Sequence, residues 1–252
     1  MSVITLQLGQ CGNQIGRQLF TTLHEDALSA PAVRKSTSPD AYCEVSLSRF
    51  FDARRGKTAR SSNSHDLLRA RAVLVDMESK AVHQTLAEAD KTGRWSYDAT
   101  CVHAQKRGSG NNWASGYHSR GPSAAEPIME MVQSQAEKCD QLSGFLVLMS
   151  VAGGTGSGVG SYLTECLRDQ FPSNAVMNAI VWPYASGEVI VQDYNAVLTT
   201  KHLQEASDCV IILQNDSTPK GRIEAFASQR HILLRPQQNH QPFPRRFTSA
   251  FV

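Results

Sequence analysis

The sequence predicts an α/β fold, in which helices cover both faces of a doubly wound, mostly parallel sheet. Short apolar runs alternate with segments of helical spacing along residues 1–216, as in a chain of strand–helix units. Two of the apolar runs end in glycine-rich turns that open helical patterns. In a parallel sheet such turns gather at one edge, where ligands bind.

The first third of the chain supplies two strands and one helix. Residues 3–8 form a short apolar run that stops at Gly9, and apolar residues then recur at helical spacing up to residue 23. Residues 31–64 are polar and are predicted to make a long surface excursion. Residues 71–76 read as a second strand that ends on an acid.

The middle of the chain contains the clearest strand–turn–helix unit. Pro127 is predicted to open a helix, because proline is favoured in a first helical turn. Residues 144–150 are continuously apolar, as expected of a strand covered on both faces. A glycine-rich turn follows, and then a helical pattern that Pro172 ends. Further strands are predicted at residues 175–182 and 209–213, with a helix at residues 194–203.

After residue 216 the composition changes. Residues 217–252 contain four prolines, six basic residues and one acid, which gives this tail a net charge of +5. We predict that residues 1–216 form an incomplete domain and that the tail is disordered, apart from one short amphipathic helix that includes Leu233 and Leu234. A solvated end is the favoured reading of the basic charge. Binding to nucleic acid or to an acidic partner is the alternative.

The overall composition excludes several classes. Hydrophobic residues make up 41% and charged residues 19%, as in ordinary globular proteins. No run approaches the ~18–20 apolar residues of a membrane-spanning helix, and the N-terminus does not resemble a secretory signal. The six cysteines include no C-x-x-C pair, so we expect a reducing cytoplasmic compartment without a disulfide framework or zinc site. Neither DNA nor a membrane is expected as a partner.

Residues 153–158 (GGTGSG) are predicted to bind phosphate. Glycine backbone can take positive φ and turn its N–H groups toward an anion, and the following helix adds its positive dipole end. Thr155 and Ser157 supply hydroxyl groups. The loop has neither the lysine of a Walker loop nor the third glycine of a dinucleotide loop, so we expect backbone and a metal to neutralise the phosphates. A turn packed for steric reasons is the alternative.

Three other segments are candidates for the same crevice. Residues 9–14 (GQCGNQ) open the first helix at the end of a strand. Asp76 and Glu78 end the second strand and suit a hydrated Mg²⁺, although an acidic helix start explains them equally well. In residues 108–113, Asn111 or Asn112 is placed to reach a terminal phosphate. From spacing alone, this last segment is better explained as an ordinary turn anchored by Trp113.

Five motifs in order resemble one family. They are residues 9–14 (GQCGNQ), 75–78 (VDME), 110–116 (GNNWASG), 153–158 (GGTGSG) and 194–196 (YNA). At these separations they closely resemble the tubulin family, over residues 3–216. The polar insert after Pro31 and the segment 182–189 (WPYASGEV) are most similar to the delta class of that family.

The resemblance implies a tubulin/FtsZ-like GTPase N-terminal domain with GTP and Mg²⁺ as ligands. The implied nucleotide contacts are Gly9, Gln10, Cys11, Asn111, Ser150, Gly153, Gly154, Thr155, Gly156, Ser157 and Asn215, with Asp76 and Glu78 on the magnesium side. Asn111 corresponds to the γ-phosphate side, and Asn215 to the residue that reads guanine, a task suited to an amide.

The resemblance also implies a cellular role. It indicates a cytoskeletal protein of the cytoplasm, at centrioles and cilia, with other tubulins or centriolar proteins as partners. Residues 217–252 match neither the central helix of the family nor its domain with the hydrolysis-promoting acid. We therefore expect this chain to be a truncated form, produced by alternative splicing or a frame change, that neither polymerises nor hydrolyses GTP.

Two departures from the family pattern affect the site. Ala152 stands where the family has glycine, and a methyl group there would cost ~1 kcal/mol if the position needed positive φ. Gln192 and Asp193 replace a Glu-Pro pair on the ribose side. Two other functions were weighed: an interaction-only protein that binds no nucleotide, and a dinucleotide-dependent oxidoreductase. The second is disfavoured because no G-x-G-x-x-G loop occurs.

Overall fold

A seven-stranded sheet lies at the centre of the structure. Its strands are β1 (Ser2–Leu8), β4 (Ala72–Asp76), β6 (Val102–Ala104), β7 (Leu142–Ser150), β8 (Ala175–Trp182), β9 (Cys209–Gln214) and β10 (His231–Leu234). They lie in the order β10-β9-β8-β7-β1-β4-β6, and all neighbours are parallel except β10, which pairs antiparallel with β9. The doubly wound, mostly parallel sheet is therefore confirmed.

This computed structural model describes residues 1–33, 39–52, 68–184, 187, 189–214 and 231–234. For residues 28–33, 39–44 and 231–234 it describes the backbone alone. Most of the predicted tail, and Asn215 with it, therefore lies outside the described residues.

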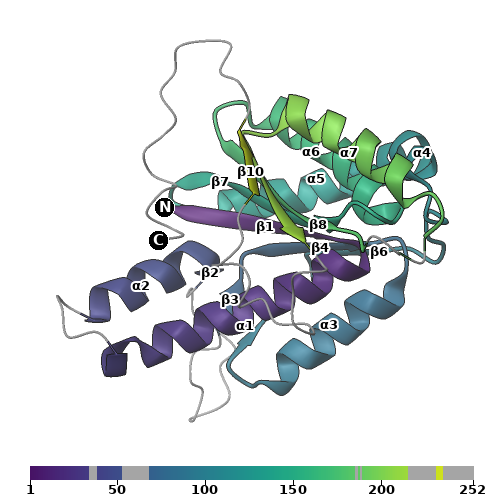
Figure 1. The fold of residues 1–252 in the computed structure, drawn as a ribbon. Coiled ribbons are helices and arrows are strands. Elements are labelled where there is room, and N and C mark those ends of the chain that lie inside the picture. Colours follow the sequence, from purple (N-terminus) through teal and green to yellow (C-terminus); the bar gives the residue numbers. More distant parts are fainter. Residues whose placement is uncertain (34–38, 53–67, 185–186, 188, 215–230, 235–252) are drawn as a thin grey trace.

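Helices cover both faces of the sheet (Figure 1). One face carries α1 (Gly9–Val33), α2 (Pro39–Phe50) and α3 (Ser79–Lys91), and the other carries α5 (Gly121–Glu137), α6 (Gly160–Gln170) and α7 (Gln192–Ala206). Short α4 (Trp113–Ser115) and the π-helical turns η1 (Gly116–Arg120) and η2 (Thr155–Val159) lead into α5 and α6. A small second sheet joins β2 (Phe51–Asp52), β3 (Leu68–Ala70) and β5 (Trp95–Ser96).

The strand pattern explains why both faces are covered. Side chains alternate between the faces of a strand, and every residue of β1 is buried. Ile4, Leu6 and Leu8 join the core on the α5–α6 side, whereas Val3 packs into the core on the α1 side with Phe20. A strand buried on both faces reads as a near-continuous apolar run, and this is why β1 and β7 were recognisable in the sequence.

The order of the strands places a topological switch point between β1 and β7. From β1 the chain moves outward through β4 and β6, and then returns to the other side of β1 through β7, β8 and β9. The helices that follow β1 and β7 consequently lie on opposite faces (Figure 1). Ligands of open α/β sheets bind at such a switch point, outside the carboxyl ends of the strands.

Three sequence predictions about elements are wrong. The stretch predicted as a surface excursion contains the end of α1 and all of α2 in its described part. Pro127 lies inside α5, because that helix continues from η1 and Pro122 occupies its first turn. Leu233 and Leu234 lie in β10, where main-chain pairing with β9 replaces the expected helix. None of the described helices is both long and apolar enough to cross a membrane.

Candidate functional site

The loop after β7 is built by close backbone approach. A Cβ on Gly154 would lie 2.7 Å from the amide nitrogen of Asn112, and one on Gly156 would lie 2.7 Å from the carbonyl oxygen of Ser150. These glycines are needed because any side chain would push neighbouring backbone away. The sequence argument from positive φ is wrong here, since no residue from Ala152 to Gly158 has positive φ. Ala152 consequently carries no left-handed strain, and the expected cost does not arise.

The hydroxyl groups of this loop have different surroundings. Ser157 is fully buried and donates to the carbonyl oxygen of Gly153, so it closes the loop on itself. The Ser150 hydroxyl oxygen accepts from the amide of Ala152, 3.2 Å away. Thr155 is half-buried and its hydroxyl lies at the contact with the loop after β6. Thr155 is therefore the hydroxyl of this loop best placed to meet a ligand.

The loop after β1 touches the loop after β7. Gly9 has φ 69° and begins α1, and a Cβ on it would lie 3.2 Å from the amide nitrogen of Gly156. Gln10 is exposed at the start of the helix. Cys11 is half-buried, and burial raises the pKa of its thiol to about 11, so the thiol is neutral near pH 7. An uncharged thiol beside an anion site is electrostatically harmless.

Asn13 holds the first loop against β4, a role that the sequence reading missed. It is fully buried, and its Nδ2 donates to the carbonyl oxygens of Gly9 at 2.9 Å and Val75 at 3.2 Å. Its Oδ1 has no hydrogen-bond partner among the described residues. A buried amide must find backbone partners, and the residues next to Asn13 in the helix, Gln10 and Arg17 among them, give no signal that it is buried.

Asp76 and Glu78 lie where β4 ends, at the same edge of the sheet. Burial is the main cause that raises the pKa of Asp76, to about 6, and the nearby Glu78 charge adds to it. The Glu78 amide donates to Oδ1 of Asp76 at 3.2 Å, and its own side chain makes no cap to α3. A Cβ on Gly108 would collide with the Glu78 carboxylate, so that carboxylate lies against the loop after β6.

The two carboxylates fit a hydrated magnesium ion. A buried carboxylate gains stability from a nearby cation, and burial together with the neighbouring Glu78 charge raises the pKa of Asp76. The described residues contain no group of three His, Cys, Asp or Glu side chains that could hold a metal. Mg²⁺ usually takes one or two carboxylates with waters and ligand phosphates, so two acids at a phosphate site suffice.

The loop after β6 packs onto the loop after β7 (residues 152–158), named the phosphate loop for its predicted role. Ser109 is buried, and its hydroxyl oxygen lies 3.4 Å from that of Thr155. Asn111 is exposed with φ 54°, and its Oδ1 would lie 3.5 Å from a Cβ on Gly153. Trp113 is buried, in line with its predicted anchoring role. The loop thus sits against the candidate site, in contrast to the ordinary turn that spacing alone favoured.

The predicted residues therefore fall into one cluster and two exceptions. The loop after β7 contacts both the loop after β1 and the loop after β6, and the Glu78 carboxylate borders the loop after β6. Asn215 lies outside the described residues. Gln192, on the expected ribose side, is buried and donates through Nε2 to the carbonyl oxygen of Tyr184 at 3.0 Å. An amide there still offers an oxygen to a ligand.

The cluster suits an anionic ligand. The first N–H groups of a helix have no partner within it, and η2 with α6 and the start of α1 bring two such ends to the crevice. Helix N-termini carry partial positive charge that favours phosphate. No lysine or arginine belongs to residues 9–14, 108–113 or 150–158, although Lys106 and Arg107 directly precede Gly108. Within these three segments, backbone N–H groups and a cation would have to balance the phosphate charge.

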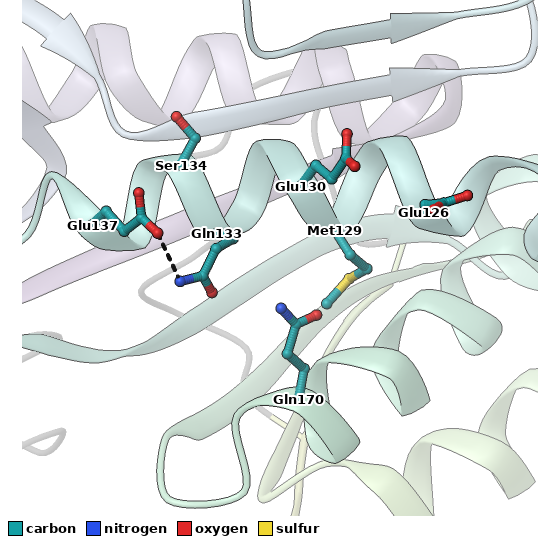
Figure 2. A pocket seen from close by; sticks show the side chains of 7 residues that line it. All are labelled: Glu126, Met129, Glu130, Gln133, Ser134, Glu137 and Gln170. Atoms are coloured by element: carbon teal, nitrogen blue, oxygen red, sulfur yellow. Dashed lines mark hydrogen bonds between the residues drawn. The ribbon is translucent and has the colours of Figure 1, made fainter.

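An open groove elsewhere on the molecule does not suit the same ligand. Figure 2 shows this groove of about 440 Å³ between α5 and the end of α6. Glu126, Glu130 and Glu137 line it, together with Met129 and Gln170. Three carboxylates would repel a phosphate, and none of the lining residues belongs to the three loops. The crevice at the carboxyl ends of the strands is therefore the better candidate.

Comparisons with known proteins agree with this geometry. The family model described as Tubulin/FtsZ family, GTPase domain, matches residues 2–220. The tubulin delta chains of Canis lupus familiaris and Mus musculus are each 47% identical over 220 residues, which cover 87% of this chain and 47% or 46% of the relative. The tubulin delta chain of Homo sapiens is 45% identical over 220 residues, with coverage of 87% and 47%.

The chain spans about half the length of the curated relatives it matches. The match includes every described loop of the crevice, and the resemblance that the motifs suggested is confirmed. On the fold, the arrangement of the loops and these matches, the chain belongs to the Tubulin/FtsZ family and is similar to delta-tubulin.

Proposed function

We propose that this chain binds GTP together with Mg²⁺ in the crevice at the carboxyl ends of β1 and β7. The observation that carries the proposal is that the loop after β7 contacts two other loops, which come from distant parts of the chain. Gly9 abuts Gly156, and Ser109 meets Thr155. A GTPase-domain match over the same residues supports GTP as the nucleotide.

Each part of the crevice has a role in the proposal. Backbone N–H groups of residues 153–157 and the Thr155 hydroxyl bind phosphate oxygens, and Gln10 and Cys11 lie on the opposite wall. Asn111 faces the terminal phosphate. Asp76 and Glu78 hold Mg²⁺ through its waters, and the ion, when bound, neutralises phosphate charge. Asn215 reads guanine, as an amide that donates and accepts along one base edge.

Equilibrium binding of a fluorescent GTP analogue with Mg²⁺ tests the proposal. We expect saturable binding that GTP displaces and ATP does not. Thr155→Ala should weaken it about tenfold, the cost of a hydrogen bond to a charged group. Thr200→Ala is a matched control, because that threonine donates to a helical carbonyl on α7 and contacts none of the three loops. A folded chain that does not bind the analogue would contradict the proposal.

We propose a cytoskeletal role at centrioles and cilia for the protein, with other tubulins or centriolar proteins as partners. The similarity to tubulin delta chains supports the cytoskeletal part. Fluorescently tagged protein in ciliated cells should coincide with a centriolar marker, and diffuse fluorescence alone would contradict the localisation.

An interaction-only protein is the second candidate, and one observation favours it. Large apolar side chains are exposed on α7 and just before it: Ile190 is 98% exposed, Tyr194 74% and Val197 68%. Exposed apolar groups at helical spacing commonly mark a contact with another macromolecule. Binding of a partner with no response to GTP or GDP would favour this candidate over the nucleotide site.

A further inference from the structure

We infer that Asn195 of α7 is a positioning residue that holds the loop of Asn111 in place and thereby sets the preference of the site for GTP over GDP. The inference rests on the proposed GTP site and deepens it. Asn195 lies on α7, outside the three loops. Its side-chain amide bonds to backbone atoms, so we assign it no direct contact with the ligand.

All the polar groups of the Asn195 side chain form hydrogen bonds to the backbone of two loops. Its Nδ2 donates to the carbonyl oxygens of Asn111 at 2.8 Å and Ala152 at 2.7 Å, and its Oδ1 accepts from the amide of Trp113 at 3.0 Å. The residue is 3% exposed. An amide has two donor hydrogens and one acceptor oxygen, so both donors and the oxygen are in use.

These bonds act on the most unusual backbone position of the site. Asn111, with φ 54°, is the one non-glycine residue with positive φ in the described parts of the chain. Asparagine tolerates this left-handed region better than most residues with a side chain, but the region is sparsely populated, and outside contacts help to hold it. The Asn195 bond to the Asn111 carbonyl provides the support, and the resulting turn leaves the Asn111 side chain facing Gly153 of the phosphate loop.

The second bond fixes the distance between the two loops. Ala152 begins the phosphate loop, and Asn111 belongs to the loop opposite, so one short side chain joins both walls of the crevice. The Ser109–Thr155 contact, at 3.4 Å, is another polar link between the two loops and is longer. Removing Asn195 therefore frees the wall that carries Asn111 to move away from the phosphate loop.

Asn195 is itself held firmly. The Thr199 hydroxyl donates to its carbonyl oxygen at 2.6 Å, within α7. On the other side, the Trp113 ring stacks on Tyr117 with centroids 4.5 Å apart, and its Nε1 donates to Ser161 at 3.3 Å. Thr199 lies on α7 and Ser161 lies on α6, and both helices pack against the sheet. A group aligned in advance by its surroundings lets a ligand bind without a further ordering cost.

Loss of the Asn195 bonds should affect binding of the terminal phosphate more than binding of the rest of the nucleotide. Asn111 is the residue of the site that faces this phosphate, whereas Gly9, Gln10 and the N–H groups of η2 serve the parts common to GTP and GDP. A displaced Asn111 therefore weakens GTP more than GDP. A general loss of stability would weaken both nucleotides alike, or neither once the protein is folded.

The experiment measures the dissociation constants of GTP and GDP for the chain and for Asn195→Ala and Asn195→Ser. Serine keeps a short donor and preserves the fold if alanine does not. Asn178→Ala is the matched control, since Asn178 is also a fully buried asparagine, bonded to Thr164 and Ser207 away from the loops. Thermal unfolding of each variant reports the purely structural cost.

We expect Asn195→Ala to weaken GTP about tenfold and GDP less than about threefold, in line with the loss of one hydrogen bond between the displaced loop and a charged ligand. Asn178→Ala should lower the unfolding temperature without changing the ratio of the two constants. If the Asn195 variants fold and the ratio of their GDP and GTP dissociation constants is unchanged, the inference is overturned while the proposed function stands. No GTP binding by the unsubstituted chain would overturn the proposed function, and the inference with it.

Discussion

The hydroxyl oxygens of Ser109 and Thr155 lie 3.4 Å apart, although their loops follow different strands. Either hydroxyl can donate to the other, so a ligand oxygen near Thr155 can exchange this contact for its own. Around this pair, glycines allow the two backbones to touch. The geometry makes the loops interdependent, and changes in one should be felt in the other.

Gly154→Ala should separate the loops. The new methyl group would lie 2.7 Å from the Asn112 amide nitrogen and 2.8 Å from the Ser109 Cβ. We expect a loss of about 1–3 kcal/mol in the free energy of unfolding, the usual cost of overpacking, and at least tenfold weaker GTP binding. Urea unfolding and nucleotide titration measure the two effects.

Gly93→Ala is the control for that substitution. Gly93 has φ 62° with open space around it, so alanine costs about 1 kcal/mol of backbone strain without a clash. It should leave nucleotide affinity unchanged. If Gly154→Ala and Gly93→Ala weaken GTP binding equally, general destabilisation of the fold explains the loss, and the contact between the loops does not.

Removal of Mg²⁺ should weaken GTP binding. A chelator leaves the phosphates without their cation, and Asp76→Asn combined with Glu78→Gln should reproduce its effect and abolish further response to it. Glu126→Gln combined with Glu130→Gln, at two exposed carboxylates on α5, serves as the charge-matched control. GTP affinity that is independent of Mg²⁺ would contradict the assignment of the two acids.

Acid should destabilise the fold through Asp98. Burial acts to raise its pKa, but hydrogen bonds from Thr100 and the Lys138 charge outweigh burial and lower the pKa to about 2. A lowered folded-state pKa stabilises above the unfolded value near 3.8, and this stability is lost as pH falls toward 2. After discounting for solvent screening we expect about 1 kcal/mol. Asp98→Asn should flatten the pH dependence of urea unfolding in this window, and an unchanged slope would contradict the prediction.

The aromatic cluster beneath α1 should carry much of the stability on that face. Phe20 is fully buried, with ring centroids 5.3 Å from Phe51, 5.6 Å from Trp95 and 5.9 Å from Tyr97. Phe20→Ala should therefore cost about 3–5 kcal/mol of unfolding free energy. A cost below about 1 kcal/mol would show that the cluster repacks around the cavity.

The sheet could be predicted from the sequence because its strands are buried on both faces. Such strands appear as short apolar runs, and β8 was found with its observed bounds. The glycine loops were found because glycine-rich turns between strands and helices are uncommon. The physical reason given for the glycines of residues 153–158 was wrong, however, because backbone approach between distant loops leaves no local signal in the sequence.

The contacts made by asparagines could not be predicted for the same reason. Asn195 and Asn13 each bond to backbone far away in the chain, and nothing in their neighbouring residues reveals the partner. The α2 helix was missed because its residues lack a clear apolar stripe. Pro127 misled the prediction, since a helix that continues from η1 tolerates a proline within it.

Hydrogen–deuterium exchange with and without GTP and Mg²⁺ tests the central claim most directly, that three distant loops form one nucleotide site. We predict slower exchange together in residues 9–14, 108–113 and 152–158, with no change in residues 126–137 of α5. Protection confined to one loop, or to the exposed face of α7, would contradict the claim.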